Sequence, residues 1–172
     1  MGEKITSSAR PAKWRTEEQA ILVGTKTAID DNPRLNARDW SGTSPIRIVI
    51  DKDQRISNEA HLFDESQKTI VFSKSKNSIY SKNILFEEID FQQDIARQIV
   101  ERLYKYEIQS VIIEGGRQTL QTFIDANLWD EARIFVGKIQ FTAGIKAPIL
   151  DKKTYKKYSI DQDELIISRN HD

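Results

Sequence analysis

The segment from Ser110 to Ile124, SVIIEGGRQTLQTFI, constrains the fold of this chain more than any other. Its apolar run, Val111 to Ile113, is β-branched and typical of a strand buried on both faces. Glu114 and the pair Gly115-Gly116 follow, and apolar residues then recur at helical spacing. A strand, a glycine turn and a helix start form half of a βαβ unit. Ligands of such sheets bind beyond the carboxyl ends of the strands, so we predict a ligand site at this turn.

The turn suits a phosphate for a physical reason. The first N–H groups of a helix have no acceptor within the helix, and the helix dipole adds partial positive charge there. Paired glycines let an anion come close to that backbone, and Arg117 and Thr119 offer further donors. The alternative is that the glycines only make a tight turn. Because the pair lacks the G-x-G-x-x-G spacing of dinucleotide-binding motifs, the pair alone does not decide between the two.

Composition narrows the classes of function. A length of 172 residues suits one domain over 1–172, with residues 1–12 interpreted as a disordered or cloning-derived leader. Lys plus Arg and Asp plus Glu number 26 each, so no net charge recruits nucleic acid or an anionic membrane. The chain has no cysteine, which excludes disulfides and thiolate chemistry, and no apolar run is long enough to span a bilayer. We expect a cytoplasmic protein without a metal site.

A second apolar run is also followed by a turn that contains glycine. The apolar run Ala20 to Val23 leads into Gly24-Thr25-Lys26-Thr27, but the spacing of an ATPase P-loop is absent. The segment from Asp30 to Arg38 follows and carries two arginines four residues apart, a loop suited to an anionic sugar phosphate. Asp30 and Asp31 also raise the alternative of a metal, but no third ligand lies at a suitable spacing.

The remaining periodicity predicts an α/β domain with a mainly parallel sheet and an antiparallel C-terminal edge. The predicted strands are 45–51, 69–73, 84–86, 132–141, 155–160 and 164–168, and the predicted amphipathic helix is 94–106. The basic run from Lys74 to Ser78 follows the strand at 69–73. Such a run is most often a solvated loop, although a strand end rich in Lys and Ser also suits the 2′-phosphate of a nucleotide.

Several separated segments together resemble one family. These are AILVGTKTAIDDNPRLNAR, PIRIVID and SVIIEGGRQTLQTFIDANLWDEARIF. They are similar to the reductase domain of the bacterial riboflavin-biosynthesis deaminase/reductase, and the likeness runs from about Lys13 to Leu150. The resemblance implies a dihydrofolate-reductase-like three-layer α/β/α fold and a homodimer. It also implies NADPH-dependent reduction of 5-amino-6-(5-phosphoribosylamino)uracil, a phosphorylated pyrimidine, to its ribitylamino product.

The same resemblance implies the roles of individual residues. Glu114 matches a substrate-contacting glutamate, and we interpret it as positioning the substrate. The substrate-binding residues are expected to be Arg15, Leu35, Arg38 and Glu114. The cofactor-binding residues are expected to be Thr27, Asp31, Lys52, Gly115, Gly116, Arg117, Gln118, Thr119, Leu120, Gln121 and Thr122.

The chain also departs from the family pattern. The zinc-binding H-x-E and P-C-x-x-C signature of the deaminase half is absent, so we expect no deamination. The family's first strand, resembling S-L-D-G-K-I-A, and its Ser-x-Trp segment are not present before Thr6. We therefore expect the first family strand to be missing. Two alternatives stay open: a related reductase of another pteridine- or pyrimidine-like ring, and a non-catalytic remnant that binds nucleotide or forms dimers.

Overall fold

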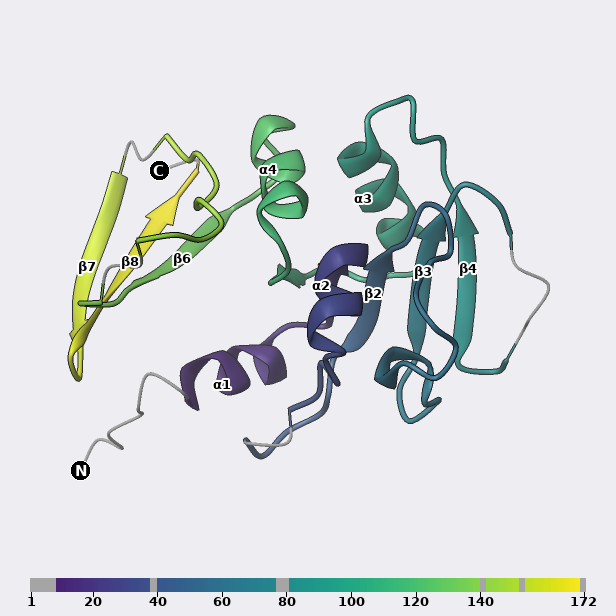
Figure 1. The fold of residues 1–172 in the computed structure, drawn as a ribbon, viewed down its shortest axis with the longest axis horizontal. Helices are drawn as coiled ribbons and strands as arrows, with labels where there is room; N and C mark the ends of the chain where they lie inside the picture. The colour runs from purple at the N-terminus through teal and green to yellow at the C-terminus, as the bar shows by residue number, and fades with distance from the viewer. Residues whose placement is uncertain (1–8, 38–39, 77–80, 140–141, 152–153, 171–172) are drawn as a thin grey trace.

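The computed structural model describes residues 9–37, 40–76, 81–139, 142–151 and 154–170 (Figure 1). The elements are α1 (Ala9–Glu17), β1 (Ala20–Gly24), α2 (Thr25–Asp31), β2 (Ile46–Ile50), η1 (His61–Phe63), β3 (Thr69–Ser73), β4 (Ile84–Glu88), α3 (Ile95–Lys105), β5 (Val111–Ile113), α4 (Arg117–Asp125), β6 (Glu131–Val136), β7 (Thr154–Ile160) and β8 (Asp163–Arg169).

The first five strands form one parallel sheet in the order β4-β3-β2-β1-β5. β1 lies between β2 and β5, with Leu22 opposite Ile48 on one side and Ile113 on the other. All five residues of β1 are buried. Short β-branched and leucine-rich strands of this kind are stable only where both faces of the sheet are covered.

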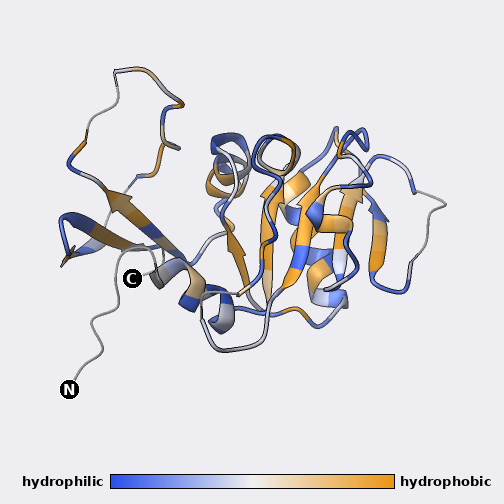
Figure 2. Cartoon of the chain, turned by 60° about the horizontal axis from the view of Figure 1, so that its bottom comes forward, coloured by the Kyte–Doolittle hydropathy of each residue, from blue (hydrophilic) through white to orange (hydrophobic). Residues whose placement is uncertain are grey.

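Helices cover both faces and complete three layers. On one face, α3 and α4 pack Ile99 and Phe123 against a cluster that includes Leu22 and Phe72. On the other face, α2 and η1 pack against a cluster that includes Val49. Figure 2 shows the strands of this sheet as the most hydrophobic part of the chain. The predicted helix over 94–106 is confirmed as α3, which begins after Asp94 because the carboxylate of Asp94 accepts a hydrogen bond from the Arg97 amide at 2.9 Å.

The C-terminal strands form a separate antiparallel sheet in the order β6-β8-β7. Helix α1 packs against it, with the Trp14 ring centroid 5.6 Å from that of Phe135 and the Arg133 guanidinium 4.6 Å from the Trp14 centroid. The predicted parallel sheet and antiparallel C-terminal strands are thus confirmed. The prediction that the strand over 132–141 continues past Val136 is wrong for residues 137–139, where the chain leaves the sheet at Gly137, and residues 140–141 lie outside the described part.

Two strand edges face the region between the sheets. In the described residues β5 pairs only with β1, and β6 pairs only with β8. No strand precedes β1 in that part of the chain, where residues 9–17 form α1 and residues 1–8 are not described. The described part of the predicted leader, residues 9–12, is therefore helical. Within the described ranges no helix has the length and apolar composition that crossing a membrane requires.

Candidate functional site

The turns after β1 and β5 lie side by side because the two strands are parallel neighbours. The contact is close at both glycines. A Cβ atom on Gly24 would collide with the Thr119 hydroxyl, and a Cβ on Gly115 would lie 2.8 Å from the Cβ of Val23. Both positions therefore require glycine for packing. The strand–turn–helix units that the sequence indicates separately meet at one edge of the sheet.

Gly116 opens a cradle of backbone N–H groups at the start of α4. Its φ of +69° is a conformation that side chains rarely adopt, and a Cβ there would lie 3.2 Å from the Thr27 hydroxyl. No side chain caps the helix, and the Leu120 amide donates the first helical bond to the Gly116 carbonyl at 3.1 Å. The amides of residues 117–119 precede that bond, so they have no acceptor within the helix. The Thr27 and Thr119 hydroxyls lie beside these donors, and together they suit an anion.

Glu114 lies directly before this cradle and is paired with Arg15. The Arg15 Nε atom donates to Glu114 Oε1 at 2.8 Å and Nη2 donates to Oε2 at 2.5 Å. Both side chains are about one quarter exposed. Parallel N–H···O bonds between a guanidinium and a carboxylate are among the strongest hydrogen bonds in proteins. Two residues expected to contact the substrate are thus brought together at the end of β5.

The structure places the other expected substrate residues differently. Leu35 is buried in the cluster beneath α2, with a φ of +49°, so its side chain belongs to the core. Arg38 lies outside the described residues.

Several expected cofactor residues lie away from the cradle. Asp31 is exposed at the last position of α2, and Asn32 caps that helix. Gln121 is engaged within the fold, because its side chain exchanges hydrogen bonds of 3.1 and 2.8 Å with the backbone of Ile149. The Thr122 hydroxyl donates to the Gln118 carbonyl at 2.9 Å.

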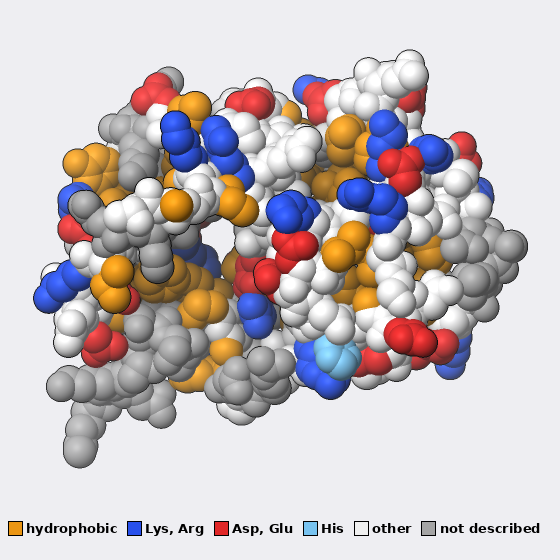
Figure 3. All heavy atoms as spheres, in the orientation of Figure 1, with side chains coloured by type: hydrophobic (Ala, Val, Ile, Leu, Met, Phe, Trp, Pro, Cys, Tyr) orange, Lys and Arg blue, Asp and Glu red, His pale blue; other side chains and the backbone are white. Residues whose placement is uncertain are grey.

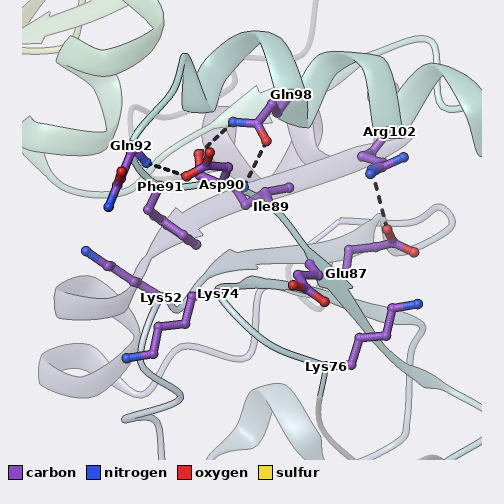
Figure 4. A pocket seen from close by; sticks show the side chains of 11 residues that line it. Lys52, Lys74, Lys76, Glu87, Ile89, Asp90, Phe91, Gln92, Gln98 and Arg102 are labelled. Atoms are coloured by element: carbon purple, nitrogen blue, oxygen red, sulfur yellow. Dashed lines mark hydrogen bonds and ion pairs between the residues drawn. The ribbon is translucent and has the colours of Figure 1, made fainter.

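Lys52 lines a cavity of about 730 Å³ at the carboxyl ends of β2, β3 and β4 (Figure 4). The lining residues come from these strand ends, from the loop between β4 and α3, and from α3: Lys52, Lys74, Lys76, Glu87, Glu88, Ile89, Asp90, Phe91, Gln92, Gln98 and Arg102. Lys and Arg side chains gather on the surface at this corner, with acidic side chains among them (Figure 3). A second hollow of about 460 Å³, lined by Ile46 and Lys68, lies at the opposite, amino ends of the strands.

Sequence reasoning missed Asp51, which directly follows β2 and is only 1% exposed. Its Oδ2 atom accepts a hydrogen bond from the Ile56 amide at 3.0 Å, and its Oδ1 atom lies 3.2 Å from the Thr25 hydroxyl. The Thr25 hydroxyl also donates to the Ile50 carbonyl at 2.7 Å. Asp51 therefore fixes the turn that presents Lys52, and an acidic residue ending an apolar strand was the available signal.

Arg47 in β2 was also missed. Its buried guanidinium donates to the Arg34 and His61 carbonyls, both at 3.0 Å, and to Asp64 Oδ1 at 2.7 Å. This hydrogen bond holds the pKa of Asp64 well below its usual range, and bonds from Ser66 act in the same direction. The network ties the loops on one side of the sheet to β2. A charged residue inside an apolar strand, PIRIVID, was the signal.

Three layers of helix and sheet define an α/β protein, and the glycine-capped helix start at the carboxyl edge of the sheet is suited to an anion. Comparison with known families makes the assignment more specific. The family model of the RibD C-terminal domain matches residues 3–143, and the chain belongs to this family. The family assignment indicated by the sequence motifs is confirmed.

Named relatives agree with this assignment. The 2,5-diamino-6-ribosylamino-4(3H)-pyrimidinone 5′-phosphate reductase of Archaeoglobus fulgidus is 27% identical over 171 residues, which cover 90% of this chain and 78% of that protein. The riboflavin biosynthesis protein RibD of Aquifex aeolicus is 30% identical over 129 residues, covering 71% of this chain and 35% of that protein. The chain thus spans about a third of the RibD relative but most of the archaeal reductase.

Solved structures share the fold. The deaminase/reductase of Thermotoga maritima superimposes with a TM-score of 0.78 and 26% identity, covering 93% of this chain and 47% of that one. The riboflavin biosynthesis reductase Rib7 of Saccharomyces superimposes with a TM-score of 0.79 at 22% identity, covering 95% of this chain and 80% of that one. In the described part of this chain no group of three His, Asp or Glu side chains is arranged to hold a metal ion.

Proposed function

We propose that this chain is an NADPH-dependent reductase that converts 5-amino-6-(5-phosphoribosylamino)uracil to its ribitylamino product. The archaeal relative carries the name of a pyrimidinone phosphate reductase, and the family is that of the RibD reductase domain. The observation that carries the proposal is the juxtaposition at the end of β5. There the Gly116 cradle directly follows Glu114, which is paired with Arg15.

The residues of the cradle fit a dinucleotide cofactor. The amides of residues 117–119 lie beside the hydroxyls of Thr27 and Thr119, and this arrangement supports a role for them in holding the pyrophosphate. The nicotinamide supplies the hydride when the cofactor is bound, and the protein has to hold the two reactants in register. The cofactor roles of Asp31, Lys52, Gln118, Leu120, Gln121 and Thr122 stay predictions from the family resemblance.

The pairing of Arg15 with Glu114 supports a role for both residues in binding the substrate. We propose that the Arg15 guanidinium releases Glu114 and binds the substrate phosphate when the substrate enters. A carboxylate and a phosphate can each accept the same two parallel hydrogen bonds from a guanidinium. Glu114 then accepts hydrogen bonds from the substrate hydroxyls. Each charge is neutralised by the other before the exchange, which limits the cost of holding both in a half-buried site. The roles of Leu35 and Arg38 stay predictions.

Two measurements test the proposal. NADPH titration, followed by fluorescence of Trp14, Trp40 and Trp129, is expected to saturate. With the phosphorylated pyrimidine present, NADPH absorbance is expected to fall with turnover. Absence of saturable NADPH binding up to millimolar concentration would overturn the proposal.

The two alternative functions predict different results. A non-catalytic remnant binds NADPH without turnover, and the β5 edge without a strand partner in the described residues is the observation that favours it. If the true substrate is a related ring that carries no phosphate, the chain reduces that substrate, and Arg15→Ala changes the KM for it only slightly.

A homodimer and a cytoplasmic location also stay predictions. Large exposed apolar side chains on and near the antiparallel sheet support self-association, namely Phe135, Val136, Ile139, Ile145, Ile149, Tyr155 and Tyr158. Sedimentation of the purified chain over a range of concentrations measures the oligomeric state, and a monomer throughout would contradict the dimer.

A further inference from the structure

Arg47 is a charged side chain in the apolar core beside β2. It is only 1% exposed and is the largest of the fully buried side chains in the described part of the chain. Alternate residues of a strand share a face, so Arg47 points to the same side of the sheet as Val49, towards the cluster beneath α2. Burying a guanidinium is costly, and well-packed apolar residues often serve a core equally well. A buried arginine at this position therefore indicates a role other than packing.

The guanidinium of Arg47 joins two loops. Its Nε atom donates to the Arg34 carbonyl at 3.0 Å, in the loop that follows α2. Its Nη1 atom donates to the His61 carbonyl at 3.0 Å and to Asp64 Oδ1 at 2.7 Å, both between β2 and β3. Its Nη2 atom donates to the Ser66 hydroxyl at 3.1 Å, in the same segment. All three nitrogen atoms are engaged, so the guanidinium is held in one orientation.

The bond to the Arg34 carbonyl fixes the peptide group between Arg34 and Leu35. A trans peptide is planar, its C=O and N–H bonds point in opposite directions, and the described residues contain no cis peptide. The Leu35 N–H is therefore directed away from Arg47. Leu35 has a φ of +49°, which residues other than glycine rarely adopt, and its side chain is buried in the same cluster as Val49. Such backbone strain persists only where the surroundings hold it, and it is frequent at ligand sites.

The Leu35 amide has no acceptor among the residues that the structure describes. Leu35 as a whole is only 4% exposed, and buried backbone N–H groups nearly always have a partner. An oxygen atom of a bound ligand would satisfy this donor. The family resemblance assigns Leu35 to the substrate, but its side chain is occupied in the core. The contact with the substrate therefore falls to the backbone of Leu35.

The same loop contacts the helix that carries Arg15. A Cβ atom on Gly42 would lie 2.8 Å from the Cβ of Thr16, which directly follows Arg15 on α1. The Ser44 hydroxyl accepts a hydrogen bond from the Ala37 amide at 3.2 Å, so residues 37 and 44 are tied together. The described parts of the loop thus contact the Arg47 network at one end and the helix of the candidate substrate site at the other.

From these contacts we infer that Arg47 is a positioning residue for substrate binding. It holds the peptide group between Arg34 and Leu35 with the Leu35 amide directed towards the phosphorylated pyrimidine, and Arg47 itself touches no ligand. The inference rests on the proposed function, because the substrate is taken from that proposal. It adds a buried residue to the determinants of substrate affinity, and the pair with Asp64 holds that residue in place.

The test separates positioning from stability. Arg47→Met keeps an unbranched side chain but has no donor for the Arg34 carbonyl. The KM for the phosphorylated pyrimidine is expected to rise roughly tenfold or more, with kcat changed less than about twofold and the Kd of NADPH unchanged. Asp64→Asn is the control, because it lowers stability but leaves the bond between Arg47 and Arg34, so its KM is expected to stay near the wild-type value. An unchanged KM in Arg47→Met, or an equal rise in both variants, would overturn the inference.

A second variant keeps the test decisive if Arg47→Met does not fold. Arg47→Lys retains a positive charge for Asp64, and its ammonium group is expected to bind that carboxylate as the strongest acceptor nearby. The Arg34 carbonyl then loses its donor, so the KM is expected to rise as in Arg47→Met. A folded Arg47→Lys variant with the wild-type KM would contradict the role of Arg47.

Hydrogen exchange at the Leu35 amide distinguishes this inference from the proposed function. In the wild type the phosphorylated pyrimidine is expected to slow that exchange, and in Arg47→Lys the slowing is expected to be weaker. Turnover without any protection of the Leu35 amide refutes the inference and leaves the reductase proposal standing. Protection without turnover refutes the reductase proposal and leaves the role of Arg47 standing, and the absence of both refutes both.

Discussion

Arg15 and Glu114 lie 99 positions apart in sequence and join through two parallel hydrogen bonds at the end of β5. The pair connects α1, which also packs against the antiparallel sheet through Trp14, to the end of the parallel sheet. It therefore fixes the position of a guanidinium beside the Gly116 cradle. The pair thus contributes to the placement of α1 and also neutralises the charge of Glu114 in the candidate substrate site.

Replacing Arg15 by lysine is expected to raise the KM for the phosphorylated substrate roughly tenfold or more, because lysine cannot form the bidentate bonds. The Kd of NADPH is expected to stay unchanged. Steady-state kinetics and NADPH titration measure the two quantities. Lys13→Ala, on the same helix in an exposed pair with Glu17, is the matched control and should change neither. A parallel rise in the Kd of NADPH would contradict the assignment of Arg15 to the substrate.

Replacing Gly116 by alanine is expected to weaken NADPH binding and to lower the free energy of unfolding by about 1–3 kcal/mol, because the φ of +69° strains any side chain. The added Cβ would also press against the Thr27 hydroxyl in the cradle. Denaturant unfolding and NADPH titration measure both effects. Gly144→Ala is the control, since its Cβ meets no atom within 4 Å and its change should stay within about 0.5 kcal/mol. Unaltered NADPH affinity in Gly116→Ala would remove the cradle from the site.

The Arg47–Asp64 pair predicts a stability that depends on pH. The pKa of Asp64 is lower in the folded chain than its ordinary value of 3.8, so the pair stabilises the fold fully above about pH 4. That contribution is lost as the pH falls towards the folded pKa. Asp64→Asn is expected to cost about 1–3 kcal/mol at pH 7, because buried Arg47 loses its carboxylate. Urea unfolding at pH 7, 5 and 3 should show the difference from wild type shrinking at the lowest pH; a constant difference would contradict the assignment.

The raised pKa of Tyr106 predicts that the stability of the fold changes at alkaline pH. Burial, with the hydrogen bond to Glu87 and the charge of Glu87, raises the pKa of Tyr106 to about 12. A raised pKa gives stability that is complete below about pH 10 and is lost as the pH rises through 12. Phenolate absorbance should show one late titration among the five tyrosines, and Tyr106→Phe should remove it. Tyr104→Phe, two residues away and 81% exposed, should leave the late step intact.

The parallel sheet and the glycine turn were predictable because their signals are local. The buried run at Val111–Ile113, the change to helical spacing after Gly116 and the apolar runs of β1, β2 and β3 each lie within a few residues. The prediction of the strand over 132–141 is wrong for residues 137–139, because apolar alternation continues there although pairing with β8 ends. No local signal indicated that the antiparallel strands form their own sheet, because the periodicity of a strand does not indicate which strand it pairs with.

By itself, then, the sequence determined most of the strands and the helices α3 and α4, because backbone period acts over one or two turns of chain. It indicated the family through the resemblance of its separated segments. Only the tertiary structure decided which side chains meet at the candidate site. It paired Arg15 with Glu114, buried Leu35 in the core, and joined Lys52 to Lys74 through a backbone bond. These contacts depend on which strands become neighbours, and that order follows from packing both faces of the sheet at once, over distances that no local pattern records.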